Sequence, residues 1–158
     1  MRSIDLISNS VDDTKAIGMI LGKNLSGGDV LELNSDLGGG KTTLVHGVVS
    51  GFGSDDAVSS PSFTICNTYQ ANDNRTVSHF DFYRLEEAGI VSSELIESID
   101  DLLTLVIVEW GDVVTSVLPS DKVSAVISSR SNTKRVITVI CPERHTRLFE
   151  ALQSWRDT

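Results

Sequence analysis

A glycine-rich segment lies between an apolar run and a sequence with helical periodicity. The apolar run is residues 30–33, the glycine segment is residues 35–42, and the helix is expected over residues 43–49. A strand, a glycine loop and a helix in that order can bind phosphate, because glycine amides without a Cβ approach phosphate oxygens closely. The helix also points its free N–H groups and positive dipole end at the same anion. The segment therefore predicts an α/β fold with a phosphate-binding loop.

Two side chains at the end of this loop have the chemistry of a nucleotide site. Lys41 would reach the β- and γ-phosphates of a nucleoside triphosphate, and the Thr42 hydroxyl would bind Mg²⁺. The usual pattern G-x-x-x-x-G-K-[ST] has glycine where this chain has Ser35. We expect Gly39, an additional small residue in the loop, to relieve backbone strain instead. A glycine-rich β-turn that merely precedes Lys-Thr is the alternative, and the flanking strand and helix favour the nucleotide site.

The acidic composition constrains the partners of the chain. The formal net charge is −9, and no Lys or Arg occurs between Glu86 and Asp121. Direct binding of nucleic acid depends mainly on Lys and Arg that neutralise phosphates, so this composition argues against it. An acidic surface fits either a basic protein partner or simple solvation.

Length, cysteine content and hydropathy indicate one domain in a reducing compartment. At 158 residues the chain is expected to form a single domain over residues 1–158. Cys66 and Cys141 lack the spacing of a metal site and are expected to be buried free thiols. The N-terminus has no signal-peptide pattern, and no apolar run approaches about 18 residues. We therefore expect a cytoplasmic protein with no membrane partner.

The remaining patterns predict alternating strands and helices. Residues 10–13 form a capping sequence for a helix that runs to about residue 25, and a hairpin is expected around residues 71–74. Residues 105–108 form a continuous apolar run, typical of a strand buried on both faces. Other strands are expected at 3–8, 63–70, 75–82, 123–128 and 136–141, and other helices at 86–103 and 143–155. The apolar positions of the acidic helix are Ile90, Leu95, Ile96, Ile99, Leu102 and Leu103.

A nucleotide site of this kind needs an acidic group besides the loop hydroxyl, because Mg²⁺ prefers oxygen ligands and often takes one from a strand end. Asp81 and Glu109 each end an apolar strand. Glu109 follows the more apolar strand, whereas Asp81 lies in a polar cluster with His79, Tyr83 and Arg84. These residues alone do not decide between the two carboxylates, and either could instead be a helix cap or a surface group.

Three neighbours of these carboxylates each have an ordinary and a functional interpretation. His79 is expected to be a packed strand residue, with the role of a catalytic base as the alternative. Trp110 is expected to lie partly in the core, although a ring beside a metal site could also pack against a partner. Arg84 could form a surface ion pair or contact the γ-phosphate.

Four separated segments, taken together, resemble one protein family. Their sequences are SDLGGGKTT at 35–43, SPSFT at 60–64, HFDFYRL at 79–85 and VEW at 108–110. In sequence, order and spacing they are similar to the G-D-L-G-A-G-K-T-T, S-P-T-[FY]-T, H-F-D-L-Y-R-L and V-E-W segments of the TsaE family, also called YjeE. The resemblance covers about residues 10–140. The chain departs from the family at Ser35 and Ser62, and the family's arginine before the last strand could correspond to Lys134 or Arg135.

The resemblance implies a single-domain P-loop NTPase fold, with a mostly parallel sheet, an antiparallel strand pair and helices on both faces. It implies a nucleotide site formed by Ser10, Thr14, Leu37, Gly38, Gly39, Gly40, Lys41, Thr42 and Thr43. It also implies that Thr42 and Glu109 hold Mg²⁺, which would settle the choice left open above. Asp81 would position the attacking water in a switch-like segment, and Lys41 would stabilise charge developing on the phosphates. Residues 60–64 would form a second switch-like loop.

The same resemblance implies an ATPase of low intrinsic activity that supports N6-threonylcarbamoyladenosine (t6A) modification of tRNA. Its partners would be the TsaD and TsaB proteins, and tRNA would be contacted only indirectly through them. A small-molecule kinase is one alternative, but residues 86–121 contain none of the arginines that a kinase lid needs. A non-hydrolysing nucleotide sensor is another. The absence of an N-K-x-D motif favours ATP over GTP.

Overall fold

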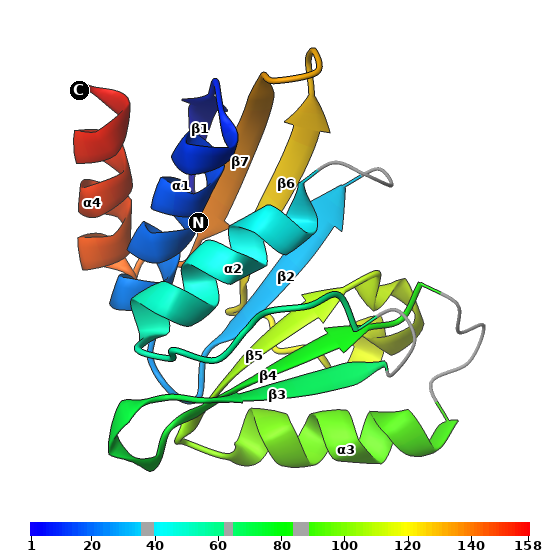
Figure 1. Ribbon diagram of the computed structural model, residues 1–158. Helices are drawn as coiled ribbons and strands as arrows, with labels where there is room; N and C mark the ends of the chain where they lie inside the picture. Colours follow the sequence, from blue (N-terminus) through cyan, green and yellow to red (C-terminus); the bar gives the residue numbers. More distant parts are fainter. Residues whose placement is uncertain (36–39, 62–64, 84–88) are drawn as a thin grey trace.

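The computed structural model describes residues 1–35, 40–61, 65–83 and 89–158, which form one sheet with helices on both faces (Figure 1). The helices are α1 (Val11–Asn24), α2 (Lys41–Phe52), α3 (Gly89–Asp100) and α4 (Thr146–Arg156), with short 3-10 helices η1 (Asn72–Asn74) and η2 (Gly111–Val117). The strands are β1 (Arg2–Ser8), β2 (Val30–Ser35), β3 (Cys66–Gln70), β4 (Thr76–Asp81), β5 (Thr104–Glu109), β6 (Val123–Ser129) and β7 (Arg135–Cys141).

The seven strands follow the order β1-β7-β6-β2-β5-β4-β3. The four central strands, β6, β2, β5 and β4, pair in parallel. Pairing is antiparallel at both edges, between β1, β7 and β6 on one side and between β3 and β4 on the other. The predicted α/β fold with a parallel centre is therefore confirmed, and the antiparallel part extends beyond a single pair.

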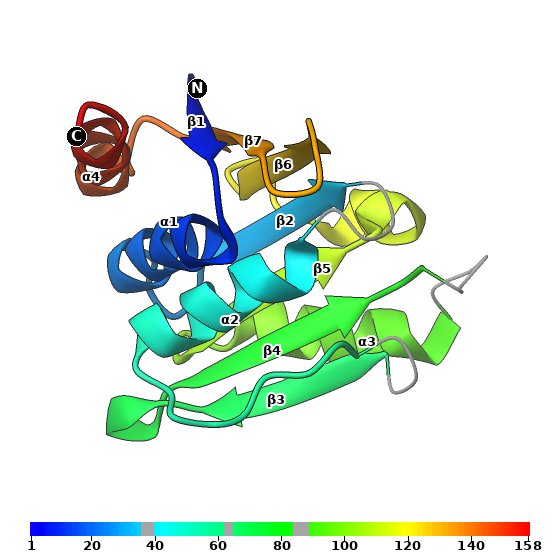
Figure 2. The same ribbon diagram turned by 45° about the horizontal axis from the view of Figure 1, so that its top comes forward.

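The sheet separates two cores, because successive residues of a strand point to opposite faces. In β5 all six residues are buried. Leu105 and Ile107 join the core under α1 and α2, whereas Val106 and Val108 join a smaller core with Leu95 of α3. Figures 1 and 2 show α1 and α2 on one face of the sheet and α3 on the other. The apolar run at residues 105–108 is thus a strand covered on both faces, as predicted.

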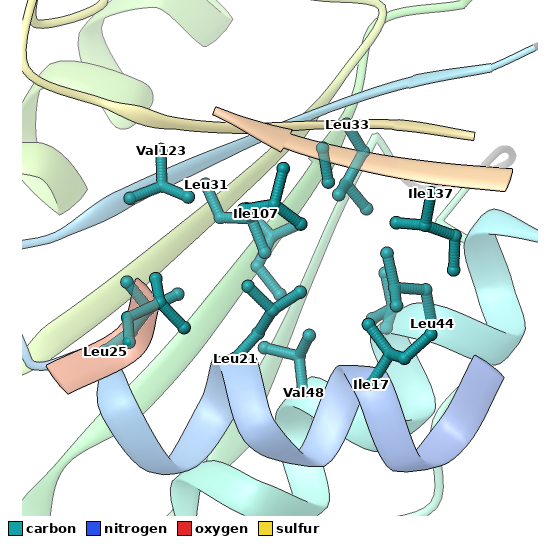
Figure 3. Close-up of a cluster of buried hydrophobic side chains, with 14 of the residues drawn as sticks. Ile17, Leu21, Leu25, Leu31, Leu33, Leu44, Val48, Ile107, Val123 and Ile137 are labelled. Atoms are coloured by element: carbon teal, nitrogen blue, oxygen red, sulfur yellow. The ribbon is translucent and has the colours of Figure 1, made fainter. Parts of the chain in front are cut away.

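The larger core fixes the position of α2, the helix that follows the glycine loop. Side chains of α1 and α2 meet those of the central strands in this core (Figure 3). The two helices also approach so closely that their backbones are in contact. A Cβ built on Gly22 would lie 2.1 Å from the Val48 carbonyl oxygen, and one built on Gly47 would lie 2.2 Å from the Lys15 carbonyl oxygen. No side chain fits between the helices at these positions.

The beginning of α1 agrees with the capping sequence. Ser10 is the N-cap, and its hydroxyl accepts a hydrogen bond from the backbone N–H of Asp13 at 3.0 Å. Such a cap satisfies one of the free N–H groups of the first turn. Within the described ranges no helix is both long enough and apolar enough to cross a membrane.

The acidic helix is shorter than predicted. It ends at Asp100, because the next residue, Asp101, turns the chain by accepting hydrogen bonds from Leu103 N and Thr104 Oγ1, both at 2.9 Å. Its predicted apolar positions differ in burial. Leu95 is buried, but Ile96, Leu102 and Leu103 are 41%, 80% and 49% exposed. The side chain of Ile90 lies outside the described part of the chain.

The strand expected from residue 63 begins at Cys66. Ile65 has a left-handed backbone with a φ of 68°, so it cannot continue an extended strand. Residues 63 and 64 lie outside the described ranges. The last helix likewise begins three residues later than expected, at Thr146.

Candidate functional site

Two buried carboxylates lie side by side at the ends of parallel strands. Asp81 of β4 and Glu109 of β5 are register partners, and they are 7% and 3% exposed. Glu109 also pairs with Leu33 of β2, the strand that leads into the glycine segment. By the alternation of strand residues, both carboxylates share the sheet face of Val77 and Ile107, which is the face covered by α2. The strands thus direct two acids toward the start of α2.

The start of α2 has the features of an anion site. Gly40 is the N-cap with a φ of 98°, a conformation that favours glycine, and as a glycine it has no side chain to cap the first turn. No acidic residue occupies that turn, so the first turn adds no negative charge at the positive dipole end of α2. Thr42 is exposed in this turn, and Lys41 is half-buried. Leu37, Gly38 and Gly39 lie outside the described residues.

Ser35 stands where the usual loop has its first glycine, and its position explains why serine is tolerated. It is the last residue of β2 and pairs in register with Ile127 of β6. Its backbone is therefore extended, a conformation open to every residue. The strain that we expected Gly39 to relieve does not arise at Ser35.

Lys41 lies against an aromatic pair. Its Nζ is 4.5 Å from the centroid of the Trp110 ring, and the Tyr83 ring lies 5.0 Å from the same ring at a tilt of 51°. Trp110 adopts a left-handed backbone with a φ of 57° directly after Glu109, a strained conformation for a bulky residue. Trp110 is half-buried, as expected. Lys41 and Trp110 line a cavity of about 310 Å³ together with Ser35 and Asp112.

A second cavity, of about 220 Å³, also borders the start of α2, through Gly40 and Thr43. It brings together four of the sequence-predicted residues, namely Ser10, Thr14, Gly40 and Thr43. Arg135 also lines it, with Asn132 and Thr133 of the β6–β7 turn, whereas Lys134 does not. The Thr14 and Ser8 hydroxyls share a buried hydrogen bond of 2.7 Å. Of the two basic candidates, Arg135 rather than Lys134 therefore lines the cavity next to Gly40.

Glu109 has a buried hydrogen-bond partner. His79 Nε2 lies 3.0 Å from Glu109 Oε2, and the two side chains are 1% and 4% exposed. His79 is packed within its strand, as expected, but its contact with Glu109 was not predicted. The sequence held one indication of this contact. His79 stands two residues before Asp81, so in a strand the two side chains face the same side.

Asp81 is held by the local backbone. Its Oδ1 accepts a hydrogen bond from Tyr83 N at 2.9 Å, and its own N–H donates to the carbonyl of the left-handed Ile65 at 2.7 Å. Ile65, the residue before β3, is thereby held next to Asp81. Residues 62–64 and Arg84, which were also candidates, lie outside the described part of the chain.

The donor set suits a hard cation with few protein ligands. Within the described ranges, no group of three or more His, Cys, Asp or Glu could hold a metal ion. A hydroxyl such as Thr42 and a carboxylate such as Glu109 are the oxygen ligands that Mg²⁺ takes when phosphates and water complete its shell. The cysteines are free, Cys66 half-buried and Cys141 buried. Burial raises the pKa of the Cys66 thiol to about 11, so this group stays protonated.

Comparisons with known proteins agree on one family. A family model described as Threonylcarbamoyl adenosine biosynthesis protein TsaE matches residues 8–137. The tRNA threonylcarbamoyladenosine biosynthesis protein TsaE of Bacillus subtilis (strain 168) is 35% identical over 142 residues, which cover 87% of this chain and 85% of that protein. The protein of the same name from Rickettsia conorii is 30% identical over 136 residues, covering 84% of this chain and 75% of its own.

A solved structure supports the same assignment. The crystal structure of Bacillus subtilis YdiB matches with a TM-score of 0.76 and 29% identity, covering 97% of this chain and 95% of that one. The fold, the α2 start with its strand-end carboxylates, and the match over residues 8–137 point the same way. The chain belongs to the TsaE family of threonylcarbamoyl adenosine biosynthesis.

Proposed function

We propose that this protein is a Mg²⁺-dependent ATPase of low intrinsic activity that acts on the TsaD/TsaB complex during t6A modification of tRNA. The observation that carries the proposal is the pairing of Asp81 with Glu109 beside β2, at the sheet edge where α2 begins. The start of α2 has no acid in its first turn and would bind the phosphates. The two buried acids would bind the cation, so the anion site and the metal ligands are different groups. ATP with its bound cation needs both.

The two cavities flank the α2 start and fit different parts of the nucleotide. Lys41, Thr42 and Thr43 hold the phosphates together with the loop residues Leu37, Gly38, Gly39 and Gly40. The cavity lined by Ser10, Thr14 and Arg135 takes the nucleoside. The guanidinium of Arg135 adds positive charge next to Gly40, where a Cβ would lie 3.9 Å from Arg135 Nε. These residues bind and orient the nucleotide.

Thr42 and Glu109 would hold Mg²⁺, which would supply positive charge to neutralise the charge that develops on the phosphates. Lys41 adds a second positive charge. Its ammonium, which lies over the Trp110 ring, would move from that ring to the phosphates. Asp81 orients the attacking water, because its carboxylate faces the same side of the sheet as Glu109. Both acids are nearly fully buried, so bulk solvent screens their charges little and their electrostatic effects are strong.

Contact with tRNA is indirect. The formal net charge of −9 disfavours phosphate-backbone binding. Glu94 and Glu97 are exposed on α3, and they offer an acidic surface to a basic protein partner. The family takes part in t6A biosynthesis, and TsaD and TsaB are the proteins on which ATP hydrolysis acts.

Phosphate release from ATP and Mg²⁺ tests the proposal. The purified chain alone is expected to release phosphate slowly, and addition of cognate TsaB and TsaD is expected to raise the rate. The Lys41→Ala variant serves as the blank. Flat traces with partners present, alongside intact ATP binding, would contradict hydrolysis and leave a nucleotide-dependent regulator. Formation of ADP together with a phosphorylated metabolite, without free phosphate, would indicate a small-molecule kinase.

A further inference from the structure

The contact between His79 and Glu109 has a geometry that defines its chemistry. Their facing atoms, Nε2 and Oε2, are 3.0 Å apart, which is hydrogen-bonding distance. The carboxylate form of Glu109, which is the form that could hold a cation, can only accept, so in that state Nε2 is the donor of this hydrogen bond. The other ring nitrogen, Nδ1, is also buried and has no hydrogen-bond partner among the described residues. The imidazole is therefore oriented by Glu109 rather than by a second polar group.

The fold leaves the imidazole little freedom. His79 lies in β4 between Asn67 of β3 and Ile107 of β5, and its side chain is 1% exposed. His79 faces the same side of the sheet as Asp81 and stands two residues before it, further from the C-terminal end of β4. The ring thus lies on the same face as the two carboxylates but further from the C-terminal ends of the strands, and it is not at the surface that a ligand would touch.

We propose that His79 is a positioning residue for Glu109. Donation from Nε2 occupies Oε2, so Oε1 is the oxygen of Glu109 that would be left for the cation that accompanies the nucleotide. The inference rests on the proposed function, since it assigns Glu109 to that cation. Partners that orient a ligating carboxylate typically change metal affinity by about 10- to 100-fold when they are removed.

Metal affinity measured without turnover tests this role. Mn²⁺ is titrated by electron paramagnetic resonance into the full-length protein with a non-hydrolysable ATP analogue. His79→Met removes the donor at similar volume, and its Mn²⁺ affinity is expected to fall by about 10- to 100-fold. His79→Gln retains an amide donor at a comparable distance and is expected to recover most of that loss. Binding of the analogue in EDTA is expected to be the same in all three proteins.

The outcomes separate this inference from the proposed function. A wild-type protein that binds no analogue would overturn the nucleotide site itself. Normal analogue binding with equal Mn²⁺ affinity in wild type and His79→Met would overturn only the role of His79. An equal loss in His79→Met and His79→Gln would also overturn it, because the loss would then follow packing rather than the donor.

A double substitution provides a second test. If His79 acts through Glu109, His79→Met should cause no further loss of Mn²⁺ affinity in a Glu109→Ala background. An additive loss would contradict the proposal. Should His79→Met fail to fold, as judged by near-ultraviolet circular dichroism, His79→Asn replaces it, because the shorter amide cannot reach Glu109.

Discussion

Replacement of Glu109 by Gln is expected to lower partner-stimulated ATP turnover by about 10²- to 10³-fold while ATP still binds. The substitution removes one negative charge and preserves shape, and the amide oxygen can still accept the hydrogen bond of His79. Loss of a preorganised electrostatic group at a reacting centre typically has an effect of about this size. Single-turnover phosphate release with saturating partners measures the chemical step, and equilibrium titration of ATP measures binding.

Glu150→Gln is the matched control for this substitution. Glu150 is exposed on α4, so the same chemical change there should leave turnover unchanged. The same variant distinguishes an ATPase from a regulator that only senses nucleotide. A sensor with Glu109→Gln would keep its cellular function without hydrolysis, whereas an ATPase would lose it. Wild-type turnover in Glu109→Gln would contradict the assignment of Glu109 to the cation.

Replacement of Gly22 by Ala is expected to lower the free energy of unfolding by about 2 kcal/mol. The added Cβ would lie 2.1 Å from the Val48 carbonyl oxygen and 2.7 Å from Phe52 N, which are both backbone atoms of α2. Forcing a methyl group into such a contact costs up to about 3 kcal/mol. The higher helix propensity of Ala offsets about 1 kcal/mol of this. For a chain of this size the melting temperature should fall by about 4–8 °C.

Urea denaturation measures the effect, and Ser50→Ala provides the comparison. Ser50 is exposed on α2, so its substitution should change stability by less than about 0.5 kcal/mol. Because α1 holds α2, the Gly22→Ala variant should also bind ATP more weakly than Ser50→Ala. A Gly22→Ala protein as stable as wild type would show that the two helices separate at no cost.

Much of the fold could be predicted because its signals are local. The glycine segment between a strand and a helix, and the apolar run of β5, are both contiguous in sequence. The end of α3 could not be predicted, since Leu102 and Leu103 continue the apolar pattern of the helix. Hydrogen bonds to the Asp101 side chain override that pattern. Similarly, the left-handed backbone of Ile65 has no signal in its residue type, which favours an extended strand.

The candidate site divides in the same way. Lys41 and Thr42 could be proposed as site residues because the loop motif is continuous. Asp81 and Glu109 could be proposed because each ends an apolar strand. The sequence could not show whether Lys134 or Arg135 lies near the start of α2. The β6–β7 turn comes close to that helix only because β6 is the neighbour of β2 in the sheet, and the strand order is not visible in the sequence. The contact of His79 with Glu109 likewise depends on the register between β4 and β5, which no short segment encodes.

Calorimetric titration of ATP and Mg²⁺ into the wild-type protein and Lys41→Ala tests the nucleotide site most directly. The lysine ammonium lies at the start of α2, 4.5 Å from the Trp110 ring centroid. We predict saturable binding of one ATP per wild-type chain and no measurable binding by the variant. Absence of binding to the wild type, or equal binding by both proteins, would contradict a P-loop nucleotide site at this position.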